Sequence, residues 1–123
     1  MKKQLFLSAL IIFSCILTNP GKAGADITTD LIGQWKFDEA SGTTAVDSAG
    51  SNNASLVNGP IWTTGKLGNA ILFDGTNDYV NAGASATLNP SDEITLSAWV
   101  NLNSNSGFQK FISRNTSKYA LGL

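Results

Sequence analysis

Short runs in which apolar and polar residues alternate, separated by turn residues, make up most of the chain beyond residue 25. The longest run is Glu93–Leu102, which places Ile94, Leu96, Ala98, Val100 and Leu102 on one side and Thr95, Ser97, Trp99 and Asn101 on the other. Side chains two residues apart share a face of a β-strand, so this run predicts a half-buried strand. The segment from Gly33 to Asp38 alternates in the same way and predicts a strand with Trp35 and Phe37 on one face.

Further short strands are predicted wherever an apolar run is bounded by Gly, Pro, Asn or Asp. These strands cover residues 54–57, 61–64, 69–73, 78–82, 108–113 and 119–123. The loop Asp74-Gly75-Thr76-Asn77 joins two of them and predicts a hairpin between 69–73 and 78–82. Because no segment after residue 25 keeps a helical period of 3.6, we expect an all-β fold, a sandwich or a barrel.

The first 25 residues have the three parts of a secretory signal peptide. Lys2 and Lys3 precede an apolar run from Leu5 to Leu17, and Ala23-Gly24-Ala25 supplies the small residues of a cleavage site. The run is shorter than the roughly 20 apolar residues that a membrane helix needs. We therefore expect residues 1–25 to be removed by cleavage after Ala25 and to lie outside the fold. The rest of the chain is expected in the periplasm, at the cell surface or in the medium, and it is expected to contain no membrane span.

A lipoprotein signal is the competing interpretation of this segment, because Cys15 follows a small residue. Phe13 is bulky for such a site, and Ile16 and Leu17 continue the apolar run beyond the cysteine. These two features favour ordinary cleavage.

Removal of the leader changes the composition of the chain. Of the 123 residues, 98 remain, enough for one domain, with five Lys or Arg against nine Asp or Glu and a net charge of −4. No basic patch suited to nucleic acid is present. The single cysteine leaves with the leader, so the exported domain has no disulfide of its own.

Several motifs, in this order, resemble the laminin-G-like family of the concanavalin A-like lectin and glucanase superfamily. They are Gly33-Gln34-Trp35-Lys36-Phe37-Asp38-Glu39, Ser41-Gly42-Thr43-Thr44, Asp47-Ser48-Ala49-Gly50, Leu56-Val57-Asn58-Gly59-Pro60 with Trp62, Gly65-Lys66-Leu67-Gly68-Asn69-Ala70, Phe73-Asp74-Gly75-Thr76-Asn77-Asp78-Tyr79-Val80 and Thr95-Leu96-Ser97-Ala98-Trp99-Val100. Each motif is weak alone, but their order and close spacing make the resemblance specific over residues 32–123, essentially all of the chain beyond the leader.

The resemblance implies an antiparallel jelly-roll β-sandwich, often with a bound calcium ion, that serves as a carbohydrate-binding or adhesive module of a larger extracellular protein. Family domains continue well past the segment Tyr119–Leu123, so the resemblance also implies an incomplete domain whose C-terminal strands are missing and which is part of a longer chain. The alternative is that a partner chain or a swapped protomer supplies these strands.

Catalysis is not expected from these residues. The chain has no histidine, which excludes Ser-His-Asp and Cys-His sites within it. The Glu-x-Asp-x-x-Glu pattern of the glucanase branch is absent, and the only glutamates, Glu39 and Glu93, lie at strand ends. We expect a non-catalytic module that binds a glycan or an extracellular protein. The alternatives are a structural or adhesive domain and an accessory fragment of a glycoside hydrolase.

Two groups of residues are candidates for binding. Oxygen ligands for calcium are offered by Asp38, Glu39, Asp47, Asn52 and Asn53; the competing interpretation is that Asp and Asn only cap turns here. A sugar ring could stack on Trp62, Trp99 or Tyr79; the competing interpretation is that tryptophans fill the core of a sandwich.

Overall fold

The computed structural model describes residues 5–13, 29–103, 109–114 and 119–122, and within 5–13 it describes the backbone. It contains ten β-strands and one short 3₁₀ helix in these residues, so the chain is all-β. The elements are β1 (Leu5–Phe13), β2 (Leu31–Trp35), β3 (Thr44–Ala45), β4 (Ala54–Val57), β5 (Ile61–Thr64), β6 (Asn69–Phe73), β7 (Tyr79–Asn81), η1 (Ala86–Leu88), β8 (Thr95–Leu102), β9 (Lys110–Ser113) and β10 (Ala120–Gly122).

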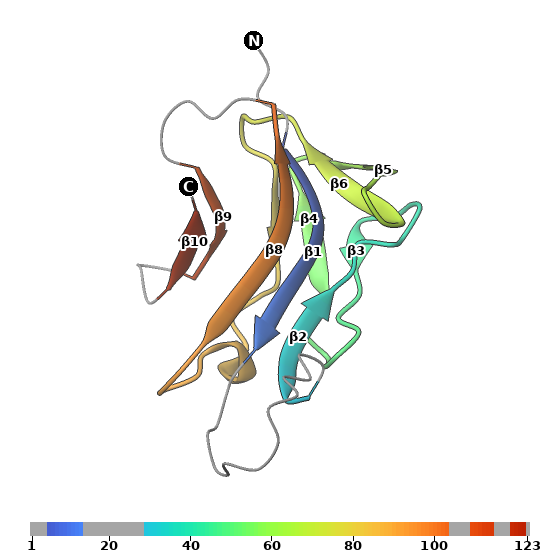
Figure 1. Ribbon diagram of the computed structural model, residues 1–123. Helices are drawn as coiled ribbons and strands as arrows, with labels where there is room; N and C mark the ends of the chain where they lie inside the picture. The colour runs from blue at the N-terminus through green and yellow to red at the C-terminus, as the bar shows by residue number, and fades with distance from the viewer. Residues whose placement is uncertain (1–4, 14–28, 104–108, 115–118, 123) are drawn as a thin grey trace.

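The strands form three antiparallel sheets. The largest contains β2, β1, β6, β5 and β8, the second has the order β3-β4-β7, and β9 pairs with β10. Figure 1 shows β1 running along the middle of the largest sheet, between β8 on one side and β2 on the other. The hairpin of β9 and β10 lies beside β8 in the same view.

One apolar core joins the two larger sheets. Trp35, Ile71 and Phe73 contribute from the five-stranded sheet, and Ala45 and Ala54 contribute from the three-stranded sheet. Phe37, which follows β2, and Leu88 of η1 complete the buried cluster. The alternation predicted for β8 is confirmed, because Leu96, Ala98 and Val100 pack against this core while the residues between them are exposed.

The predicted alternation of buried and exposed side chains at Gly33–Asp38 is confirmed, but the strand is shorter than predicted. Trp35 and Phe37 are both almost fully buried, at 0% and 1% exposure. The strand nevertheless ends at Trp35, because Phe37 has a φ of 58°. A bulky side chain rarely adopts this left-handed conformation, so the packing of the phenyl ring in the core stabilises a backbone that the local sequence disfavours.

The hairpin predicted between residues 69–73 and 78–82 is wrong. Both strands exist, as β6 and β7, but β6 pairs with β5 and β1 while β7 pairs with β4 in the other sheet. The loop between them therefore crosses from one sheet to the other. Asp74 and Asp78 support this loop, since their carboxylates accept hydrogen bonds from the backbone N–H groups of Thr76 and Asp74.

The N-terminal apolar run lies within the fold, contrary to the expectation that it would lie outside. Eight of the nine residues of β1 have register partners in β8, and the other edge of β1 pairs with β6 at Leu5–Leu7 and with β2 at Leu10–Phe13. The cleavage site predicted after Ala25 lies outside the described residues. Cleavage and export remain predictions, which strand pairing does not test.

Candidate functional site

Asp47 organises the loop that was predicted to hold calcium. It is a buried polar residue, 4% exposed, at a bridge to Trp35 of β2. Its carboxylate accepts five hydrogen bonds. Oδ1 accepts from the backbone N–H groups of Gln34 at 2.9 Å, Ala49 at 3.0 Å and Gly50 at 3.0 Å, and Oδ2 accepts from the backbone N–H of Asn52 at 3.0 Å and from its Nδ2 at 3.3 Å.

These contacts set the protonation state of Asp47. Burial alone would raise the pKa of this carboxyl, but the backbone N–H groups of Gln34, Asn52, Ala49 and Gly50 outweigh it and hold the pKa below its ordinary value. Each N–H stabilises the ionised form, so the loop retains a carboxylate at neutral pH. Because nearly all the lone pairs of this carboxylate already face N–H donors, few remain for a cation.

The two amides predicted as further calcium ligands also hold the loop. Asn53 Oδ1 accepts from the backbone N–H of Asp47 at 3.0 Å. Asn52 Oδ1 accepts from Thr87 Oγ1 at 3.0 Å, and its backbone carbonyl accepts from Trp35 Nε1 at 2.9 Å. The structure thus brings Asp47, Asn52 and Asn53 together, and their contacts are of the turn-stabilising kind that the competing interpretation described.

Asp38 and Glu39 lie on a neighbouring stretch and contact different partners. Asp38 Oδ1 accepts from the backbone N–H of Asn69 at 3.3 Å, and Asn69 Nδ2 donates to the backbone carbonyls of Asp38 at 3.1 Å and Glu39 at 3.4 Å. Glu39 Oε1 accepts from the backbone N–H of Val46 at 2.7 Å. The second oxygen, Oε2, is buried and has no hydrogen-bond partner among the described residues. Sequence reasoning named Glu39 but could not foresee this unpartnered atom.

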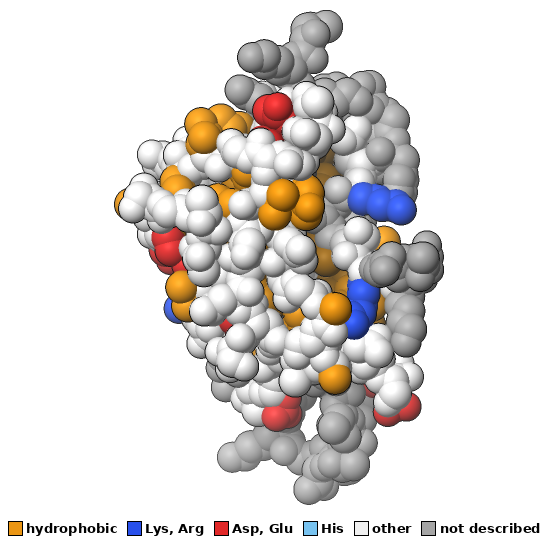
Figure 2. Space-filling model, turned by 180° about the vertical axis from the view of Figure 1, so that it is seen from behind, with side chains coloured by type: hydrophobic (Ala, Val, Ile, Leu, Met, Phe, Trp, Pro, Cys, Tyr) orange, Lys and Arg blue, Asp and Glu red, His pale blue; other side chains and the backbone are white. Residues whose placement is uncertain are grey.

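Acidic side chains do not gather into a cluster in the described part of the chain. No group of three or more His, Cys, Asp or Glu side chains there is arranged to hold a metal ion. The face drawn in Figure 2 agrees, because its acidic groups lie well apart from one another. A calcium site in the described residues would have to draw on carbonyl and amide oxygens as well as carboxylates.

The three candidate aromatic residues lie in different environments. Trp62, on β5, packs against the core, and its Nε1 donates to the carbonyl of Gly42 at 2.8 Å. Tyr79 is 48% exposed on β7 of the smaller sheet. Trp99 is 67% exposed on β8, on the face opposite to the core. Trp62 thus has the core-covering role of the competing interpretation, whereas Trp99 offers an accessible ring.

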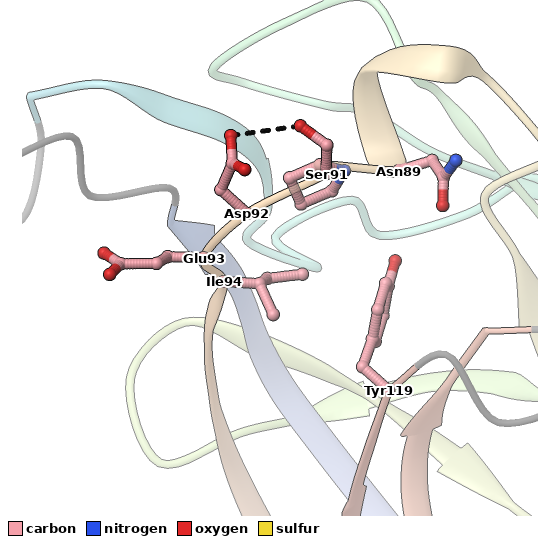
Figure 3. Close-up of a pocket in the computed structure, with 7 residues that line it drawn as sticks. Asn89, Ser91, Asp92, Glu93, Ile94 and Tyr119 are labelled. Carbon is pink, nitrogen blue, oxygen red and sulfur yellow. Dashed lines mark hydrogen bonds between the residues drawn. The ribbon is translucent and has the colours of Figure 1, made fainter.

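A hollow that sequence reasoning missed lies at the start of β8. It has a volume of about 350 Å³ and is lined by Asn89, Pro90, Ser91, Asp92, Glu93, Ile94 and Tyr119. In Figure 3, Ile94 and Tyr119 face each other, and Asp92 points toward Ser91 while Glu93 points away. Tyr119 donates its hydroxyl to the carbonyl of Leu88 at 2.8 Å, and Asn89 Oδ1 is buried without a partner in the described structure. The sequence indicated only that the turn residues Asn89-Pro90-Ser91-Asp92 interrupt the chain before β8.

Comparisons with known proteins gave no relatives. No protein-family model matches the chain, no curated protein matches it, and no solved structure matches it. Within the residues that the structure describes, no helix has the length and apolar character needed to cross a membrane.

Proposed function

We propose that this chain is a secreted, non-catalytic binding module for a carbohydrate or another cell-surface ligand, built on a laminin-G-like jelly-roll sandwich. The observation that carries the proposal is the exposed ring of Trp99. It lies in the outer row of β8 with Thr95, Ser97 and Asn101, all of them exposed. An accessible indole beside hydroxyl and amide groups can stack on the apolar face of a sugar and hydrogen-bond its hydroxyls.

The proposed calcium ion fits the surroundings of Glu39 better than those of Asp47. The carboxylate of Asp47 is surrounded by N–H donors, which repel a cation. Glu39 Oε2 is instead a buried carboxylate oxygen with no donor in the described structure. Calcium prefers such oxygen ligands, and a bound ion would remove the cost of burying this atom without a partner.

The calcium part is tested by melting the protein in a chelator and then with added CaCl₂. We expect calcium to raise the melting temperature of the unsubstituted chain and to have a smaller effect on Glu39→Gln. Asp74→Asn is a matched control, because Asp74 is exposed and lies in a different loop. Equal shifts in all three proteins, or none in the unsubstituted chain, would contradict a site at Glu39.

The ligand part is tested by glycan-array binding of the secreted protein, with and without a chelator. We expect Trp99→Ala to reduce binding roughly tenfold or more, since ring stacking is lost, and Trp99→Phe to retain part of it. Ile61→Ala is the matched control, because Ile61 is 57% exposed on β5 of the same sheet. Binding that is unchanged in Trp99→Ala would refute the role of this ring. If no glycan is retained by any form, a structural or adhesive role would be favoured instead.

A further inference from the structure

The outer row of β8 places polar side chains on both sides of the Trp99 ring. The row consists of Thr95, Ser97, Trp99 and Asn101, all exposed, while the residues between them turn toward the core. Side chains two residues apart in a strand lie about 7 Å from each other. The hydroxyl of Ser97 and the amide of Asn101 are therefore close enough to reach the sugar rings next to one that stacks on Trp99.

Polar residues near Trp99 follow β8 and do not continue across the sheet. The described ladder partner of Trp99 is Ala9 of β1, and alanine has no hydrogen-bonding side chain. The ladder through Asn101 continues with the apolar residues Phe6, Leu72 and Ile61. A ligand with many hydroxyl groups would therefore be bound best when it lies along the strand.

The sheet that contains this row has no charged residue in its strands. Asp, Glu, Lys and Arg are all absent from β1, β2, β5, β6 and β8. The charged residues closest to the row in the sequence are Asp92 and Glu93, which are exposed and precede Thr95. Proteins bind the sulfate and carboxylate groups of acidic ligands through Arg and Lys. The row lacks such cations and has acids near its start, so it favours a neutral sugar chain over an anionic one.

The open surroundings of Trp99 suit the interior of a chain better than its end. Small ligands and chain ends are usually enclosed in a cleft that buries most of their surface. The hollow at the start of β8 is lined by residues 89–94 and Tyr119, whereas Trp99 is 67% exposed on the strand face. A polymer can pass over such a ring and continue beyond it in both directions.

We propose that the outer row of β8 binds an interior stretch of a neutral polysaccharide that lies along the strand. One sugar ring stacks on Trp99, Ser97 hydrogen-bonds the ring on one side of it, and Asn101 hydrogen-bonds the ring on the other side. The inference rests on the carbohydrate part of the proposed function, and it adds the charge of the ligand, its direction and the part of the chain that is recognised.

The charge of the ligand is tested by the retardation of the secreted protein in native gels that contain soluble polysaccharides. The neutral probes are a glucan, a mannan and a galactomannan, and the anionic probes are pectate and heparin. We expect at least one neutral probe to retard the protein and neither anionic probe to do so. The affinity should change less than about twofold between about 0.05 M and about 0.5 M NaCl, because salt screens interactions between charged groups.

The position of the chain is tested by calorimetric titration with oligosaccharides cut from the neutral polymer that is bound. We expect the affinity to rise at least about fivefold from the disaccharide to the hexasaccharide, and to stay the same when the terminal ring of the hexasaccharide is opened by reduction. Ser97→Ala and Asn101→Ala should each weaken binding of the hexasaccharide about 2- to 10-fold, because each removes one hydrogen bond. Ser55→Ala is the matched control, since Ser55 is an exposed serine on β4 of the other sheet.

Several results would overturn this inference while carbohydrate binding itself stands. Retardation by pectate or heparin that is lost at high salt would mean that the ligand is anionic. Full affinity for the disaccharide, or loss of binding after terminal reduction, would mean that a chain end is recognised. If Ser97→Ala and Asn101→Ala do not both weaken binding more than Ser55→Ala does, the chain does not extend to both sides of Trp99. If no polysaccharide of either charge is bound, the inference and the proposed carbohydrate function both fail.

Discussion

Replacing Asp47 by alanine removes one carboxylate that serves five N–H donors at once. The two backbone N–H groups on half-buried residues are those of Gln34 and Asn52, and the other two belong to the exposed residues Ala49 and Gly50. Water can reach the exposed pair, so the main cost comes from the half-buried pair. At about 1–3 kcal/mol for each buried donor without a partner, we expect Asp47→Ala to lower the free energy of unfolding by about 2–6 kcal/mol.

The prediction is measured by urea and thermal unfolding of the same full-length preparation. For a domain of this size, the loss corresponds to a fall in melting temperature on the order of 10–20 °C. Asp74→Ala is the control: Asp74 is exposed, and its carboxylate accepts from the backbone N–H of Thr76 at 2.8 Å in an open turn. We expect the control to lose less than about 1 kcal/mol.

Asp47→Asn separates the charge of the side chain from its shape. The amide keeps one acceptor oxygen, but its NH₂ group would face either the N–H groups at Oδ1 or those of Asn52 at Oδ2. We therefore expect a loss between those of Asp74→Ala and Asp47→Ala. If Asp47→Ala and Asp74→Ala were equally mild, the carboxylate would not organise the loop, and its five contacts would not explain the burial of Asp47.

Three further predictions concern the same loop. The pKa of Asp47 is lower in the folded chain than in the unfolded chain. The ionised carboxylate therefore contributes its full stability above the unfolded pKa of about 4, and this contribution is lost as the pH falls through the folded pKa. The difference in free energy of unfolding between the unsubstituted chain and Asp47→Asn should thus become smaller when unfolding is measured at acid pH. Gly50→Ala should destabilise by about 1–3 kcal/mol in urea unfolding, because a Cβ would lie 2.8 Å from Asp47 Oδ2 and 3.0 Å from the carbonyl oxygen of Ile32; an unchanged midpoint would show that the loop yields without cost. Trp35→Phe removes the donor to the carbonyl of Asn52 and part of a fully buried ring. Thermal melting followed by near-ultraviolet circular dichroism should therefore show a free energy of unfolding lower by about 2–4 kcal/mol. An unchanged free energy of unfolding would contradict the role of this bond.

Local sequence signals predicted the strands well because each signal is complete within a few residues. β4, β5 and β6 have the bounds that the turn residues around them predicted, such as Asn58-Gly59-Pro60 and Gly65. Pairing is different, because it depends on residues far apart in the chain. The loop between β6 and β7 contains the residues of a hairpin, yet it connects two sheets, and the same turn chemistry serves both connections.

The sequence predicted which residues make up the Asp47 loop, but it did not predict whether they bind calcium or stabilise a turn. A loop rich in Asp, Asn and Gly suits calcium and also suits a self-contained network of turns. The direction of the N–H groups around Asp47 separates the two roles, and a sequence does not contain this direction. The outward position of Trp99 was predictable, because strict alternation along β8 fixes it relative to Ala98 and Val100.

Trp35 connects the β1 position to the Asp47 loop. Its backbone pairs with Leu10 of β1 on one side and with Asp47 on the other, and its Nε1 donates to the carbonyl of Asn52. The N–H of its neighbour Gln34 donates to Asp47. If the β1 position were empty, β2 would lose its ladder on one edge, and the only described strand contact holding Trp35 in register would be the bridge to the loop. Removal of β1 would therefore weaken the Asp47 loop through Trp35, which pairs with both.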